Sequence, residues 1–133
     1  MRFTEHELTA ALHGAAKSVM AAQRRDVRKG KVDVETAWKE MDRLQRFTLL
    51  DGLGGQLLPV LTALPDVEVE PGTRPAFTDE QIATAVEERV GEEGGGRMRR
   101  KVVVASRIAL VKIALSHVPP RSDPDALTVP DHL

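Results

Sequence analysis

The hydrophobic residues at the start of the chain recur every three or four positions, which is the spacing of one helical face. They are Leu8, Leu12, Ala15, Val19 and Ala22. Thr4 and Glu7 have the spacing of a capping box, and Phe3 with Leu8 can form a hydrophobic staple around it. Gly30 can supply the left-handed residue that ends a helix. The pattern therefore predicts a helix from residue 4 to about residue 29.

A second apolar face begins after Asp33, which is a favourable N-cap residue. The residues of this face are Val34, Ala37, Trp38, Met41, Leu44 and Thr48. Because the connection is short, residues 4–50 are predicted to form an antiparallel helical hairpin. Three glycines in residues 51–55 each lower helix propensity by about 1 kcal/mol, so we expect the hairpin to end there. A short helix over residues 56–64 follows, with Pro59 in its first turn.

The chain changes character between residues 65 and 77, where valines alternate with acids and prolines are frequent. This segment is predicted to be an extended connector, and Pro71-Gly72 fits the centre of a type II turn. Thr78 then opens a second capping-box sequence. It predicts a helix over residues 78–91, which a flexible glycine-rich linker separates from the rest of the chain.

The last predicted helix, residues 97–117, is apolar on almost every side. Such a helix has to be enclosed by the other helices or by a partner chain, because an exposed apolar surface of this extent favours aggregation. Pro119-Pro120 stops the helix. The positions expected in the core or in an interface are Val102, Val104, Ile108, Val111 and Leu115.

Together these elements predict an all-α fold, a bundle of four to five helices with a central, largely buried C-terminal helix. The length of 133 residues is typical of a single domain. We expect one helical domain over residues 1–118 and a flexible, proline-containing tail over residues 119–133.

The composition narrows the class of protein. The chain has no cysteine, which excludes disulfides and thiolate chemistry and favours a cytoplasmic location. The first residues lack the pattern of a signal peptide. The longest apolar stretch, Val102 to Leu115, is too short for a membrane span and is interrupted by charges. We therefore expect a soluble protein with no membrane partner.

Charged residues are distributed in blocks, although the net charge is only −1. Lys and Arg outnumber Asp and Glu by ten to seven in residues 1–50 and by seven to three in residues 97–133, whereas acids lead by ten to two in residues 51–96. The blocks can neutralise one another within the fold or across an oligomer. Two basic clusters could instead contact an anion or nucleic-acid phosphates. They are Arg24, Arg25, Arg28, Lys29 and Lys31, and, after the glycine-rich linker, Arg97, Arg99, Arg100 and Lys101.

No combination of residues indicates a catalytic or metal site. His6 and His13 share one side of the first predicted helix, but two turns, about 10 Å, separate them, which is too far for one metal ion. The glycine-rich segments lack the complete phosphate-loop and dinucleotide-binding patterns. We therefore predict no catalytic residue, no metal and no cofactor, and we do not expect an enzyme.

Three functions are consistent with these features. The leading hypothesis is a protein–protein interaction or oligomerisation module, either a homo-oligomer such as a dimer or a complex with a protein partner, because the last helix is so apolar. The second is a nucleic-acid-associated regulator that uses Arg24–Lys31 or Arg97–Lys101. The third is an enzyme or small-ligand carrier with a cavity between helices around Trp38, Met41 and Phe47.

Overall fold

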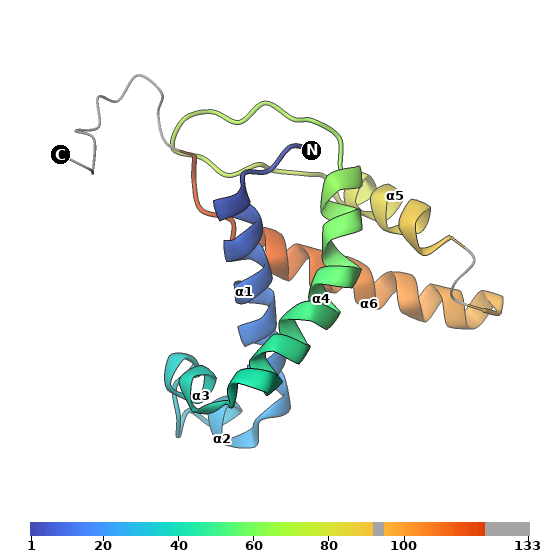
Figure 1. Ribbon diagram of the computed structural model, residues 1–133. Helices are drawn as coiled ribbons and strands as arrows, with labels where there is room; N and C mark the ends of the chain where they lie inside the picture. Colours follow the sequence, from blue (N-terminus) through green and yellow to red (C-terminus); the bar gives the residue numbers. More distant parts are fainter. Residues whose placement is uncertain (92–94, 122–133) are drawn as a thin grey trace.

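The computed structural model describes residues 1–91 and 95–121. In these residues the chain forms helices and no strand, so the all-α prediction is confirmed (Figure 1). The helices are α1 (Glu5–Gln23), α2 (Arg25–Arg28), α3 (Val34–Glu40), α4 (Arg43–Ala63), α5 (Asp79–Val90) and α6 (Arg97–Ser116). The part of the predicted linker at 92–94 and the part of the predicted tail at 122–133 lie outside the described residues. None of the described helices is long and apolar enough to cross a membrane.

Helix α1 begins where the sequence predicts but ends earlier. The Thr4 hydroxyl accepts from the Glu7 amide at 3.0 Å, and the Glu7 carboxylate accepts from the Thr4 amide at 2.8 Å. The predicted end near residue 29 is wrong, because the backbone at Arg24 is extended (φ −101°, ψ 116°) and the short α2 follows it. The Arg24 guanidinium binds the Asp26 carboxylate with N–O distances of 3.1 and 2.7 Å, which stabilises this break. Gly30, at φ +74°, ends α2 instead.

The second arm of the predicted hairpin consists of two helices rather than one. Asp33 caps α3 as expected, but the backbone at Met41 is extended (φ −65°, ψ 143°). Asp42 then caps α4, accepting from the amides of Leu44 at 2.7 Å and Gln45 at 3.0 Å. The Gln45 side chain completes a capping box. This second start signal divides the segment that we predicted as continuous.

Helix α4 also corrects the predicted break at residues 51–55 and the separate helix at 56–64, because it continues through both. Its buried face consists of Leu53, Gly54, Leu57, Val60 and Leu61. Burial of one leucine or valine contributes about 1.5–3 kcal/mol, more than the roughly 1 kcal/mol that a glycine costs in a helix. Pro59 therefore lies in the helix interior, on the solvent-exposed side, and not in a first turn.

The connector that follows α4 has the predicted form. Residues 65–77 contain no helix or strand. Gly72 has φ +82°, and the Thr73 amide donates to the Glu70 carbonyl at 3.0 Å. This geometry is that of a type II turn with glycine at its third position. Thr78 then caps α5, with Gln81 completing the predicted capping box.

Helices α1, α4, α5 and α6 pack against one another around one core (Figure 1). Alanines on the buried face of α1 keep its side chains short, which lets the neighbouring helices approach closely. The largest fully buried side chains come from α4, α5, the C-terminal part of α6, and the residues that directly follow α4 and α6. They are Leu57, Leu61, Leu64, Val60, Val86, Val90, Val111 and Val118.

The predicted burial of the C-terminal helix is wrong for half of its length. Only Val111 and Ala114 of α6 are buried, whereas Met98 and Val102 are 78% and 65% exposed. The physical reason is the placement of the helix: its C-terminal half crosses α1 and α4, and its N-terminal half extends beyond them (Figure 1). The other helices of the chain therefore cover only the C-terminal half of α6.

Two contacts with α1 fix the C-terminal end of α6. The Glu7 side chain, 4% exposed, accepts from Arg121 Nε at 3.0 Å and Nη2 at 3.2 Å. Burial disfavours ionised Glu7, but the hydrogen bonds from Arg121 and Thr4 outweigh it and hold the pKa of Glu7 below its usual value. His117 packs on Gly14, where a Cβ atom would lie 2.0 Å from the imidazole Cγ. Any side chain at position 14 would therefore force His117 or the end of α6 to shift.

Candidate functional site

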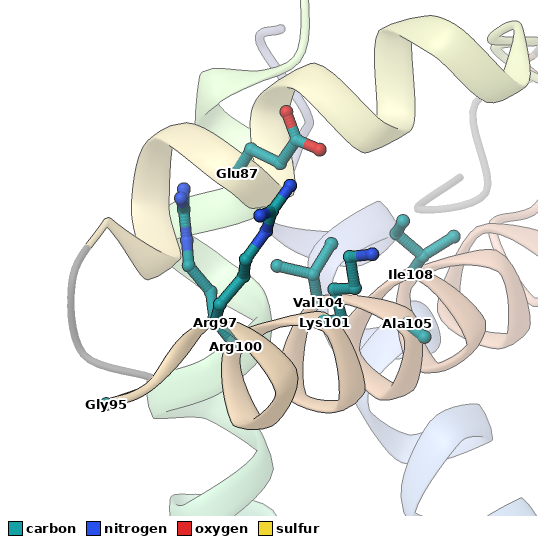
Figure 2. A pocket seen from close by; sticks show the side chains of 8 residues that line it. All are labelled: Glu87, Gly95, Arg97, Arg100, Lys101, Val104, Ala105 and Ile108. Atoms are coloured by element: carbon teal, nitrogen blue, oxygen red, sulfur yellow. The ribbon is translucent and has the colours of Figure 1, made fainter.

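The candidate site is a groove between α5 and the exposed half of α6 (Figure 2). Its volume is about 710 Å³, within the usual range for a small-molecule site. We call it the α5–α6 groove. Its lining residues are Glu87, Gly95, Arg97, Arg100, Lys101, Val104, Ala105 and Ile108.

Helical spacing explains why one groove collects three cations. Each α6 residue of the groove lies three or four positions from at least two others, so together they occupy one broad face of the helix. Figure 2 shows Arg97 and Arg100 rising from α6 toward α5, where Glu87 lies. Among the described residues, no ion pair within 4.0 Å joins Glu87 to these cations. Three positive charges thus face one negative charge at the N-terminal end of the groove.

The groove becomes apolar toward the middle of α6. Val104 and Ile108 are half-buried and lie one turn apart, with Ala105 beside them. The guanidinium groups of Arg97 and Arg100 precede this wall along the helix, whereas Figure 2 draws the Lys101 ammonium between Val104 and Ile108. The groove is therefore amphipathic, with two arginines at one end and one ammonium group beside the aliphatic wall.

A second feature of α6 is an apolar face turned away from the core. Three of its large side chains are exposed: Met98 (78%), Val102 (65%) and Ile113 (37%). Ala105 and Ala109 lie between them and are also exposed. Spacings of four, three, four and four residues place all five on one side of the helix. We call these five residues the apolar stripe.

The structure brings together only part of the predicted basic set. Arg97, Arg100 and Lys101 line the α5–α6 groove, whereas Arg99 is exposed outside it. In the other cluster, Arg24 is bound to Asp26 at 2.7 Å and lies 3.9 Å from Glu40. The remaining cations of that cluster, Arg25, Arg28, Lys29 and Lys31, are exposed on and after α2. The two clusters lie at different ends of the molecule (Figure 1).

The five predicted core or interface positions divide among three environments. Val111 is fully buried, and Leu115 packs partly buried against the core. Val104 and Ile108 line the α5–α6 groove. Val102 belongs to the apolar stripe. The prediction therefore contains one residue of the exposed face and misses the other four.

Trp38, Met41 and Phe47, around which we predicted a cavity, do not come together in one pocket in the described part of the chain. Trp38 is 8% exposed and belongs to the core, where the His13 ring contacts it edge-on at 6.2 Å between centroids. Phe47 is 63% exposed. Met41 lines a groove of about 770 Å³ next to α4 that neither aromatic residue lines. The three residues face different directions because α3 ends between Trp38 and Met41.

The fold also assembles a polar pocket that the sequence did not indicate. Ser18 Oγ lies 3.4 Å from His117 Nε2, and Lys17 Nζ lies 2.9 Å from Glu35 Oε1. In the described residues, no carboxylate hydrogen-bonds His117, and no group of three or more His, Asp or Glu side chains could hold a metal ion. The pocket therefore lacks the third member of a nucleophilic triad. Ninety-nine positions separate Ser18 from His117, so no local motif could have revealed the pair.

The fold and the site define an all-helical protein with an amphipathic basic groove beside an exposed apolar stripe. Comparison with known proteins finds no matching family model, no similar curated protein and no similar solved structure. The function is therefore argued from the geometry of this chain alone.

Proposed function

We propose that the protein is a self-association module in which the apolar stripe on α6 of one copy packs against the same stripe of a second copy. The observation that supports this proposal is the alignment of Met98, Val102 and Ile113, all exposed, on one side of one helix. Single exposed apolar side chains are ordinary on protein surfaces, whereas an aligned apolar face is typical of an interface.

An antiparallel arrangement of the two α6 helices fits the side-chain sizes of the stripe. In a twofold interface, residue i of one copy contacts residue j of the other, and j contacts i. Pairing Val102 with Ile113 of the second copy places Ala105 close to the second copy's Ala109. The alanines then allow close approach at the centre, and the larger side chains fill the space on either side.

Charge also favours a second copy in the antiparallel orientation. Asp79, at the start of α5, binds Lys112 at 2.9 Å and so lies beside the C-terminal half of α6. Antiparallel pairing brings the basic residues Arg97–Lys101 of one copy toward the acidic start of α5 in the other, whereas parallel pairing brings like charges together. A second copy of the chain in antiparallel orientation thus fits both the apolar stripe and the distribution of charge beside it.

The test is the molar mass in solution, measured by size-exclusion chromatography with light scattering. We expect the unmodified chain to run as a dimer and Val102→Glu to run as a monomer, because a carboxylate would be buried in the interface. Leu44→Glu is the matched control, since Leu44 is 70% exposed on α4 and lies outside the stripe. A monomeric unmodified chain at high concentration, or a Val102→Glu variant that stays dimeric, contradicts the proposal.

Two further predictions accompany this proposal. The absence of cysteine supports a cytoplasmic site of action. Nucleic-acid binding through Arg24–Lys31 or through Arg97–Lys101 stays a prediction, and titration with single-stranded DNA tests it.

A further inference from the structure

We infer that the α5–α6 groove binds a small amphipathic anion, a molecule with a phosphate or carboxylate head group and a short apolar chain. The inference does not require self-association: its ligand contacts lie on the side of α6 that faces α5, although Ala105 belongs to both the groove and the apolar stripe, and the proposed dimer also uses the charge of Arg97–Lys101. The observation that carries it is one groove of about 710 Å³ that holds both cations and aliphatic side chains, with Arg97 and Arg100 at one end and Val104 and Ile108 further along (Figure 2).

The basic end matches an anionic head group. Arg97 and Arg100 rise side by side toward α5 (Figure 2), and two guanidinium groups can each give charge-assisted hydrogen bonds to phosphate or carboxylate oxygens. Lys101, one position further along, adds a third charge. Among the described lining residues, Glu87 offsets one of the three positive charges, which leaves a net charge of plus two. The groove therefore attracts an anionic ligand more strongly than a cationic or neutral one.

The apolar end distinguishes this ligand from inorganic phosphate. Val104 and Ile108 form a wall in which an alkyl chain of a few carbons leaves water, and each buried methylene contributes about 0.8 kcal/mol in the ordinary case. A free phosphate ion would leave this wall unused. The head group and the chain must therefore both contribute to affinity.

The same features favour a small amphiphile over a nucleic acid. A nucleic-acid surface presents cations along an exposed track and aromatic side chains for stacking. Here the three cations, although exposed, line one groove together, and aliphatic side chains form the rest of its described α6 wall. None of the described residues that line the groove is aromatic. Short single-stranded DNA serves as the competing ligand in the test.

The experiment is a titration of the full chain with octyl phosphate, followed by calorimetry and by backbone amide shifts in NMR spectra. Inorganic phosphate and 1-octanol, titrated separately, supply the head group alone and the chain alone. We expect octyl phosphate to bind at least about tenfold more tightly than either, with the largest shifts at residues 97–108. Equal affinity for octyl phosphate and phosphate, or shifts spread over the whole surface, overturns the inference.

A pair of charge-matched variants tests the position of the site. Arg100→Gln/Lys101→Gln removes two cations from the groove, and Arg25→Gln/Arg28→Gln removes two exposed cations from α2. We expect the first variant to lose affinity for octyl phosphate by about tenfold or more and the second to bind as the unmodified chain does. Circular dichroism spectra of both variants serve as the control for correct folding.

Three outcomes of this comparison contradict the inference. They are equal losses in the two variants, an unchanged Arg100→Gln/Lys101→Gln variant, and single-stranded DNA that binds residues 97–101 more tightly than octyl phosphate does. The molar mass of each variant, measured in parallel, separates this result from the self-association proposal.

Discussion

Helices α4 and α6 differ in an unexpected way: α4 has a sequence unfavourable to a helix but buries large side chains, whereas α6 has an apolar sequence but stays largely exposed. Helix α4 contains three glycines and an interior proline, yet its Leu57 and Val60 are fully buried. Helix α6 is rich in valine, isoleucine and leucine, yet only two of its residues are buried. The difference lies in position: the buried residues of α4, from Leu53 onward, lie where it packs against α1, α5 and α6, whereas the N-terminal half of α6 extends beyond its neighbours (Figure 1).

The comparison teaches that neither propensity nor hydrophobicity of a single segment determines its surroundings. A helix with weak propensity is stabilised when one of its faces has neighbours to pack against. An apolar helix stays partly exposed when the rest of the chain is too small to enclose it. In this protein, the excess apolar surface on α6 is the basis of the self-association proposal.

The largest predicted effect is a loss of stability when the buried face of α4 is changed. Leu57→Ala removes a fully buried side chain from the centre of α4 and is expected to lower the free energy of unfolding by about 2–5 kcal/mol. Val102→Ala, on the exposed half of α6, is the control and should change it by less than about 0.5 kcal/mol in dilute, monomeric protein. Urea denaturation followed by circular dichroism measures both. Similar losses in the two variants would show that α6 is enclosed after all.

The next prediction concerns the contact that fixes the C-terminal half of α6. Gly14→Ala places a Cβ atom 2.0 Å from His117 Cγ, so the two helices must separate or His117 must move. We expect a loss of about 1–3 kcal/mol, although alanine favours a helix more than glycine does. His117→Ala in the same chain should recover most of the loss. If Gly14→Ala is as stable as the parent protein, α1 and α6 do not approach as closely as described.

A smaller effect is expected from the Glu7–Arg121 pair. Because the pKa of Glu7 is lower in the folded chain than in the unfolded one, the pair stabilises the fold at neutral pH. This stability is lost as the pH falls through the lowered pKa, where Glu7 becomes protonated in both states. Glu7→Gln should therefore cost about 1–2 kcal/mol at neutral pH and little in acid. Thermal melts from pH 7 to pH 3 test this, and a parallel loss at every pH would contradict it.

The smallest predicted effect is a gain in stability from a substitution in α4. A Cβ atom added at Gly52 meets nothing within 4 Å, and the position lies within the helix. Gly52→Ala is therefore expected to stabilise the fold by about 0.5–1 kcal/mol. Gly30→Ala, at a position with φ +74°, is the matched control and should destabilise it. A loss of stability in Gly52→Ala, measured by thermal denaturation, would indicate that α4 is not continuous at this point.

Local chemistry made some elements predictable and others not. The capping boxes at Thr4 and Thr78 and the Pro71-Gly72 turn are encoded by neighbouring residues, and the structure contains all three. The continuity of α4 depends on neighbours distant in sequence, so the glycines misled the prediction. The break at Asp42 was present in the sequence as Asp-Arg-Leu-Gln, a second capping signal that the apolar spacing obscured.

The residues of the α5–α6 groove and of the apolar stripe could also be predicted only in part. Arg97, Arg100 and Lys101 stand out in the sequence as a basic cluster, but Glu87 and the apolar wall join them only because α5 packs on α6. The apolar stripe has helical spacing that can be read from residue numbers. What the sequence could not supply was which side of α6 the core would cover, and therefore which apolar residues would stay exposed.

The most direct test of the central proposal is the accessibility of the apolar stripe in solution. Since the chain has no cysteine, Ala105→Cys introduces a single thiol at the centre of the stripe, and Gln56→Cys, exposed on α4, is the control. The measurement is the rate of reaction with a maleimide as protein concentration rises. We predict that the thiol at 105 reacts about tenfold more slowly in concentrated than in dilute protein, while the thiol at 56 does not change. A rate at position 105 that is independent of protein concentration would contradict self-association through α6.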